Sequence, residues 1–191
     1  MLKLINISKI FDEKKVLSDL TLELPRQGFV AICGPSGCGK TTLLSIIAGL
    51  TKPDGGTVNF DIMKPIVSMS FQEPRLLCGR TAAQNVNLVL GDKKATLPRA
   101  EELLCELGIT DTDQYPDELS GGMKARVSIA RALAPRADVY LFDEPFANLD
   151  RETALICADV IKRRTTEALT VAVIHDTSLA EQIADRVIYL K

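Results

Sequence analysis

The segment Gly34–Thr41, which reads GPSGCGKT, constrains the fold of this 191-residue chain more than any other feature. It matches the pattern G-x-x-x-x-G-K-[ST], follows the apolar run Phe29–Cys33 and precedes a helical pattern over Lys40–Leu50. Glycines let successive backbone N–H groups turn inward around phosphate oxygens, and a helix N-terminus adds the positive end of its dipole. The sequence therefore predicts a phosphate-binding loop between a buried strand and a helix. In such a loop Lys40 reaches the β- and γ-phosphates of a nucleotide, and the Thr41 hydroxyl binds Mg²⁺.

Strand-like and helix-like patterns alternate along the rest of the chain, after a β-rich start. Strands are predicted over Leu2–Ile7, Val16–Leu24, Phe29–Cys33, Thr57–Phe60, Ile66–Ser70, Val139–Phe142, Thr170–Ile174 and Val187–Leu190. Outside the middle of the chain, helices are predicted over Lys40–Leu50, Arg151–Ala168 and Ser178–Ala184. This order indicates an α/β fold with a parallel sheet in the core and an antiparallel β portion at the N-terminus.

The middle of the chain, from Thr81 to Ala134, is predicted to be almost entirely helical. Thr81–Gln84 has the form of a capping box, and Thr96 is expected to cap a helix over Leu97–Leu107. We therefore expect one domain over 1–191. Residues 1–71 and 135–191 form its α/β core, and residues 72–134 form an inserted all-helical subdomain.

Composition excludes several classes of protein. Hydrophobic residues make up 46% and charged residues 25%, which is typical of a folded globular chain. The formal net charge of −2 gives no basic footprint for nucleic acid, and the basic run Lys162–Arg164 is interpreted as a solvated helix end. The longest apolar runs are far too short to span a bilayer, and no secretory signal is recognised. Five cysteines without a CxxC pair are typical of reduced thiols, so we expect a cytoplasmic protein.

A second motif lies at the end of a predicted strand. Val139–Glu144 reads VYLFDE, an apolar run that ends in two carboxylates. At the carboxyl end of a parallel strand, Asp143 is expected to face the phosphate-binding loop and to hold Mg²⁺. Glu144 is then expected to orient and deprotonate the attacking water.

The third motif, Leu119–Met123, reads LSGGM and opens a predicted helix that runs to Leu133. A serine and two glycines at a helix N-terminus form a second anion site, because the hydroxyl, the bare amides and the dipole act together. A cap alone explains Ser120 but not two glycines in the first turn, which cost about 1 kcal/mol each relative to Ala. With this motif the whole chain resembles the ATP-binding subunits of ABC transporters, whose signature is LSGGQ. The resemblance implies a P-loop NTPase fold with a RecA-like core.

The resemblance also implies roles for further residues. Phe11 resembles the aromatic residue that stacks on adenine, and Gln72 resembles the glutamine that contacts Mg²⁺ and joins the helical subdomain to the core. Asn148–Asp150 resembles the D-loop, and Asp150 is also a plausible helix cap. His175, the one histidine in the chain, resembles the switch residue that contacts the γ-phosphate.

The expected site residues fall into three groups. Those with a role in hydrolysis are Glu144, His175, Lys40 and Gln72. Those expected to bind ATP are Phe11, Gly34, Pro35, Ser36, Gly37, Cys38, Gly39, Lys40, Thr41, Thr42, Ser120, Gly121, Gly122 and Asp150. The expected Mg²⁺ ligands are Thr41, Gln72 and Asp143.

The resemblance further implies an assembly. Two copies face head to tail around two ATP, so that Ser120 and Gly122 complete the partner's site. The helical subdomain docks on a transmembrane permease at the inner face of the membrane, and an extracytoplasmic solute-binding protein is expected. The sequences of Phe71–Leu77 and Tyr115–Met123 are most similar to those of importers of the nitrate, sulfonate and taurine type. Cys78-Gly79 and Ala125 depart from that group.

The sequence leaves two other functions open. The first is an ABC ATPase that acts on ribosomes, DNA or cluster assembly without a permease, although neither a second such domain nor a coiled-coil insert is present. The second is a small-molecule or nucleotide kinase with the same phosphate-binding loop. The LSGGM motif and the lone His175 argue against the kinase.

Overall fold

The computed structural model describes all residues, 1–191, and contains two sheets. A five-stranded parallel sheet has the order β5-β6-β7-β3-β8, and a three-stranded antiparallel sheet has the order β2-β1-β4. The strands are β1 (Leu2–Phe11), β2 (Lys14–Leu24), β3 (Gly28–Cys33), β4 (Gly55–Phe60), β5 (Val67–Ser70), β6 (Val139–Asp143), β7 (Leu169–Val173) and β8 (Arg186–Tyr189). The predicted α/β fold is confirmed, and so is its antiparallel N-terminal portion.

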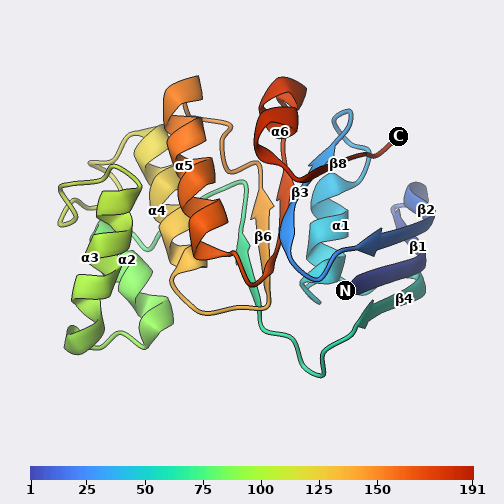
Figure 1. Cartoon of the computed structure of the whole chain (residues 1–191), viewed down its shortest axis with the longest axis horizontal. Helices are drawn as coiled ribbons and strands as arrows, with labels where there is room; N and C mark the ends of the chain where they lie inside the picture. Colours follow the sequence, from blue (N-terminus) through green and yellow to red (C-terminus); the bar gives the residue numbers. More distant parts are fainter.

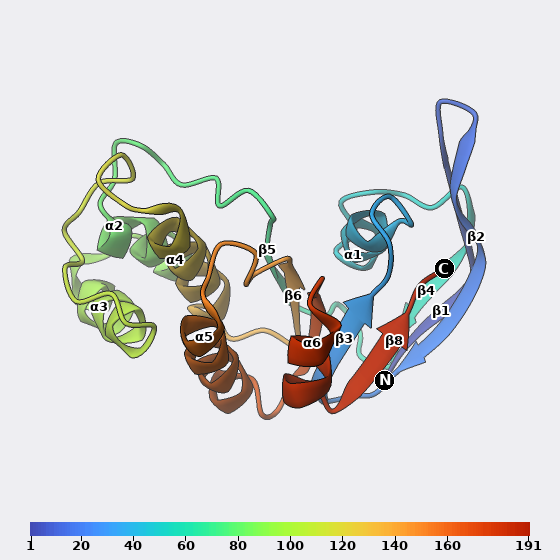
Figure 2. The same ribbon diagram turned by 90° about the horizontal axis from the view of Figure 1, so that it is seen from above.

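The helices are α1 (Lys40–Ile47), α2 (Ala82–Asn87), α3 (Leu97–Glu106), α4 (Gly121–Leu133), α5 (Arg151–Arg164) and α6 (Thr177–Ile183). Two 3₁₀ turns, η1 (Leu88–Leu90) and η2 (Lys94–Thr96), connect α2 to α3. Figure 2 shows α1 between the two sheets, and α4 and α5 on the other side of the parallel sheet. In Figure 1 the helices α2 and α3 lie at one end of the molecule and the antiparallel sheet lies at the other.

Burial on both faces explains the composition of the parallel sheet. Every residue of β6 and β7 is buried, and these strands are continuous apolar runs, apart from Asp143 and Thr170. Successive side chains in a strand point to opposite faces, so each strand contributes to two cores. One core, of 33 buried residues, lies under α4, α5 and α6. The other, of 17, joins the opposite face to α1 and the antiparallel sheet.

The helical part of the chain differs from the prediction in two ways. The Thr81 capping box is present, with Gln84 N–H donating to Thr81 Oγ1 at 3.3 Å. Thr96, however, does not cap α3, because its single hydroxyl hydrogen is shared between Asn87 Oδ1 and the carbonyl of Lys93. No helix forms between Leu107 and Ser120, where charged and turn-forming residues prevail. The expectation of an almost wholly helical segment was therefore wrong for this stretch.

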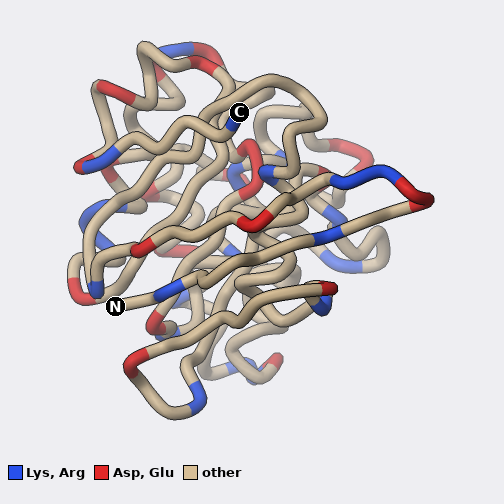
Figure 3. The backbone as a smooth tube through the Cα atoms, turned by 90° about the vertical axis from the view of Figure 1, so that its right-hand side faces the viewer, with Lys and Arg blue, Asp and Glu red and all other residues tan.

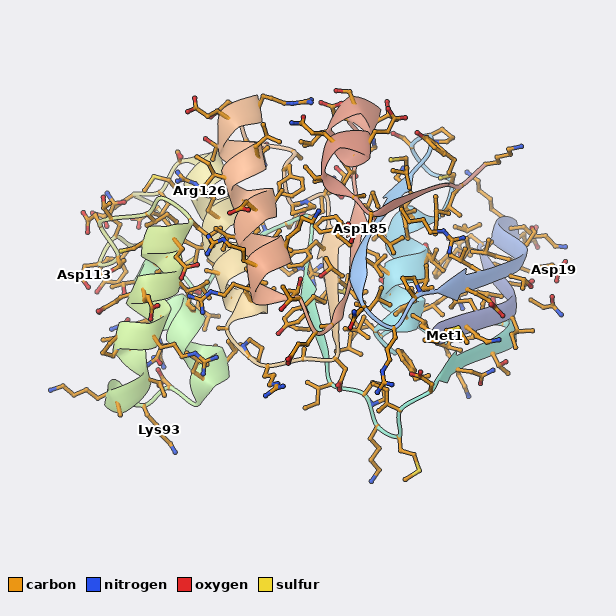
Figure 4. The ribbon with its side chains drawn as sticks, viewed as in Figure 1. Met1, Asp19, Lys93, Asp113, Arg126 and Asp185 are labelled. Carbon is orange, nitrogen blue, oxygen red and sulfur yellow. The ribbon has the colours of Figure 1, made fainter.

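Charges of both signs are spread along the chain (Figure 3). The basic end of α5 is neutralised by ion pairs, since Arg163 pairs with Asp159 and Arg164 pairs with Glu106. Figure 4 places Lys93 and Asp113 at the helical end of the molecule and Asp19 at the opposite end. No helix in the structure combines the length and the apolar character needed to cross a membrane.

Candidate functional site

Most of the residues predicted to bind phosphate or to act in hydrolysis lie at the carboxyl edge of the parallel sheet. Four adjacent strands, β5, β6, β7 and β3, end there in register, with Asp143 of β6 paired to Val173 of β7. Gln72 follows β5, Glu144 follows β6, His175 follows β7 and the phosphate-binding loop follows β3. The carboxyl ends of parallel strands are where ligands bind in open α/β sheets. Strand order therefore unites residues that lie up to 141 positions apart in the chain, from Gly34 to His175.

The loop from Gly34 to Thr41 is built around two constraints. Gly39 has a φ of +98°, and a Cβ there would lie 2.7 Å from Leu17 Cδ2, so only glycine fits. Lys40 is 5% exposed and its ammonium donates to the carbonyls of Gly34 and Pro35, each at 2.8 Å. The lysine is thus held over the loop at the N-terminus of α1, where anions are favoured.

Thr41 and Asp143 meet at the base of this loop. The Thr41 hydroxyl donates to Asp143 Oδ1 at 3.2 Å. Asp143 is 2% exposed, and burial raises the pKa of its carboxyl, while the hydrogen bond from Thr41 opposes the shift. A buried carboxylate beside a hydroxyl is an oxygen donor set, which suits Mg²⁺. No cluster of three or more His, Cys, Asp or Glu side chains could hold a metal by itself, so phosphate and water oxygens would complete the coordination.

Glu144 joins two of the other predicted residues. Its Oε1 lies 2.7 Å from His175 Nε2, and its Oε2 accepts from Gln72 Nε2 at 3.1 Å. Glu144 has a φ of +51°, a left-handed conformation that costs a non-glycine residue about 1 kcal/mol or more. The strained turn directs the carboxylate across the strand ends toward Gln72 and His175. The arrangement can hold a water molecule and accept its proton.

A cavity of about 490 Å³ contains these groups. It is lined by Val16, Ser36, Gly37, Gly39, Lys40, Thr41, Thr42, Gln72, Glu144 and His175. Nine of these ten were among the expected residues, and Val16 was not. Val16 is a partly buried valine in β2, and nothing in the sequence separates it from other strand valines. Phe11 is 46% exposed and lies outside the lining, with the Lys9 ammonium 5.1 Å from its ring centroid.

The loop that follows Gln72 is held in place by a residue that the sequence did not single out. Arg131 of α4 donates to the carbonyl of Pro74 and, at 3.0 Å, to that of Arg75. Arg75 has a φ of +46°, so these bonds stabilise an unfavourable turn. Burial lowers the pKa of Arg131. The helix that begins at the LSGGM motif therefore also holds the segment after Gln72.

The LSGGM motif lies outside the 490 Å³ cavity. Ser120 is exposed and caps α4, accepting from Met123 N–H at 3.2 Å. A Cβ on Gly122 would lie 2.9 Å from the carbonyl oxygen of Asn148, so packing within the chain requires this glycine. A Cβ on Gly121 would meet nothing within 4 Å. Asp150 caps α5, accepting from Thr153 N–H at 2.9 Å.

Comparison with known proteins places the chain in a family. Residues 17–147 match the model of the family described as ABC transporter. The chain is 43% identical to the aliphatic sulfonates import ATP-binding protein SsuB of Rhodopseudomonas palustris, over 100% of this chain and 70% of that protein. It is 35% identical to the arginine transport ATP-binding protein ArtM of Bacillus subtilis, over 100% of this chain and 87% of that protein.

A solved structure agrees with these relatives. The chain matches a dimeric ATP-binding cassette in a post-hydrolysis state, bound to ADP and Pi, with a TM-score of 0.90 and 32% identity. The match covers 100% of this chain and 94% of that one. The two motifs at the strand ends, the LSGGM helix, the fold and the relatives lead to one conclusion. The chain belongs to the ABC transporter family, as one of its ATP-binding subunits.

Proposed function

We propose that this chain hydrolyses ATP to drive an importer of a small solute. The observation that carries the proposal is the position of Glu144, which joins His175 and Gln72 at the edge of a cavity formed by the phosphate-binding loop. Relatives named for sulfonate import and arginine transport favour the transport function over an ABC ATPase without a permease.

Each residue has a distinct part in the reaction. Lys40 and the backbone amides of its loop bind the β- and γ-phosphates. Thr41 and Asp143, with Gln72, would hold Mg²⁺, which when bound neutralises charge on the phosphate oxygens. Glu144 orients the attacking water and accepts its proton, and His175, bonded to Glu144, contacts the γ-phosphate.

The proposal includes a dimer with shared sites. Ser120 and Gly121 are exposed and lie outside the cavity that holds the other groups, so one chain brings only part of its machinery together. A second copy, placed head to tail, would present its LSGGM helix N-terminus to the γ-phosphate. The similarity to a dimeric cassette supports this arrangement.

The remaining partners follow from the transport function. The permease would bind the helical subdomain over 72–134, where Leu77, Leu88 and Val89 are exposed. The chain would then act at the inner face of the membrane, together with an extracytoplasmic solute-binding protein. No nucleic acid is expected.

The test compares Glu144→Gln with Lys40→Ala. Glutamine keeps the shape of the side chain and loses the base, so kcat should fall by at least about 10²-fold while ATP still binds. Lys40→Ala should weaken ATP binding itself, because it removes the buried charge at the loop. ATP turnover and equilibrium binding of the nucleotide measure the two effects. Wild-type turnover by Glu144→Gln would refute the assigned role.

A further inference from the structure

Arg151 connects the starts of two helices, α5 and α6, which follow the segments after Glu144 and His175 at the catalytic edge. It is the first residue of α5, and its guanidinium donates to three side chains of α6 and its cap. Nη1 donates to Asp176 Oδ2 and Ser178 Oγ, each at 3.0 Å, and Nη2 donates to Gln182 Oε1 at 2.7 Å. Three acceptors on one planar group fix the orientation of the two helices more closely than a single ion pair.

The contact closes a short ring around the catalytic pair. From Glu144 the chain runs through two tight turns to α5, with Ala147 N–H donating to the Glu144 carbonyl and Leu149 N–H donating to that of Phe146. From His175 it passes directly to Asp176, which caps α6 by accepting from Leu179 N–H. The ring is closed by the 2.7 Å contact of Glu144 with His175 at one side and by Arg151 at the other.

A second cavity, of about 290 Å³, lies inside this ring. Glu144 and His175 line it as well as the nucleotide cavity, so the catalytic pair forms a wall between two spaces. Phe146, Leu149 and Leu179 supply apolar lining. A wall with a cavity behind it has little packing support, and its position therefore depends on the contacts that hold its rim.

We propose that Arg151 is a positioning residue for ATP hydrolysis: it holds the start of α6 against the start of α5 and so sets the geometry of the Glu144–His175 pair. The proposal rests on the function proposed above. Arg151 touches no reacting atom in this arrangement and acts through Asp176 and the turn that follows Glu144.

Arg151 is 45% exposed and Asp176 is 54% exposed. Exposed ion pairs add little to folding stability. Catalysis, in contrast, depends steeply on geometry, and a displacement of 1 Å can lower the rate by about 10²-fold. The loss of Arg151 should therefore be felt in turnover far more than in stability.

The experiment measures kcat and KM for ATP on the full chain. Arg151→Ala should lower kcat by about tenfold while KM changes by less than about twofold, because the loop that binds phosphates is untouched. Arg151→Lys keeps the charge but cannot reach three acceptors, so it should restore kcat in part. Gln182→Ala removes only the 2.7 Å bond and should cost less, with no further loss when it is added to Arg151→Ala.

Arg136→Ala is the matched control, since it removes an exposed pair with Glu167 at the opposite edge of the sheet and should keep wild-type kcat. If Arg151→Ala unfolds at a lower temperature than this control, Gln182→Ala decides the question. If Arg151→Ala is as stable as the control, a kcat equal to that of the control would overturn the positioning role. If Arg151→Ala is less stable, a control-like kcat for Gln182→Ala would overturn it. So would a change confined to KM. An inactive wild-type chain would instead refute the proposed function on which the role depends.

Discussion

The carboxyl edge of the parallel sheet and the N-terminus of α4 carry the two strongest motifs of the chain, and they differ in how they are completed. At the sheet edge, Thr41 bonds Asp143, and Glu144 bonds both Gln72 and His175. At the start of α4, the Ser120 hydroxyl bonds only the backbone of its own helix. The first region is an assembled site, whereas the second is a helix N-terminus that faces solvent.

The glycines of the two regions sharpen this difference. Gly39 is required by its own chain, because Leu17 and Val16 leave no room for a Cβ. Gly122 is required in the same way by Asn148. Gly121 has open space around it and a φ that any residue tolerates, so nothing within the chain accounts for it. In the proposed dimer this space would take a group from the second copy.

The first prediction tests whether the two regions work together across two chains. Lys40→Ala and Ser120→Arg should each be inactive alone, the first for want of charge and the second because bulk fills the phosphate position. In a mixed dimer one interface carries both lesions and the other carries neither. An equal mixture should then recover about a quarter of wild-type turnover, since half of the dimers hold one intact site. ATP turnover of the mixture measures the recovery.

The same comparison predicts a dependence on concentration. Only the dimer is competent, so turnover per molecule should rise as the wild-type chain is concentrated. A flat specific activity over a wide dilution series, together with no recovery on mixing, would assign the whole reaction to one chain. The LSGGM helix would then be a structural cap.

The second prediction concerns Cys38, a half-buried residue within the assembled region. Its sulfur packs beside Gly34 and against the core and does not line the 490 Å³ cavity, so alkylation should displace the loop itself and lower ATP affinity by about tenfold or more, equal to about 1.4 kcal/mol. Bound MgATP should protect the thiol. Equilibrium binding of ATP before and after treatment with a maleimide measures the effect.

The other thiols must be controlled. Cys78 and Cys105 are exposed, so both are first changed to serine. Cys33 and Cys157 are buried, and burial raises the pKa of Cys157 to about 11, which keeps that thiol unreactive. Unchanged affinity after modification of Cys38 would show that the loop does not surround the phosphates as proposed.

Much of the assembled region was predictable because its signals are local. A glycine-rich loop, an apolar run ending in Asp143 and Glu144, and a histidine after a strand each have a reason within a few residues, and parallel strands bring their ends together. The strand bounds differed from prediction by a few residues. Helix α5 ends at Arg164 rather than at Ala168, since Thr165 leaves the helical conformation with a φ of −119°, and its hydroxyl donates to the Ile161 carbonyl and accepts from the Thr170 hydroxyl.

What sequence could not supply were contacts between distant residues. Arg131 holds the loop after Gln72, Val16 lines the cavity and Arg151 joins α5 to α6, yet each is an ordinary residue in its own segment. Thr96 is a further example of a distant contact that the sequence did not predict, because its hydroxyl bonds Asn87 and not the backbone of its own helix. The local sequence predicts that such a hydroxyl will form a hydrogen bond, but the partner is determined by tertiary packing.

The third and smallest expected effect separates two roles of Asp150, which lies between the assembled region and α5. Asparagine also caps helices but carries no charge, so Asp150→Asn should unfold slightly below the wild-type temperature at pH 7, whereas Asp150→Ala should unfold clearly lower. Hydrogen bonds from the Thr153 N–H and hydroxyl hold the pKa of Asp150 below its ordinary 3.8. A lowered pKa in the folded state means that the ionised carboxylate adds stability above pH 3.8, and that this part is lost as pH falls through the folded value. The advantage of wild type over Asp150→Asn should therefore shrink in acid, as thermal unfolding from pH 7 to pH 3 would show, and a difference independent of pH would exclude the charge from the cap.

Turnover of the same variant completes the test: lower kcat at wild-type stability places Asp150 in the shared site, and unchanged kcat confines it to capping α5.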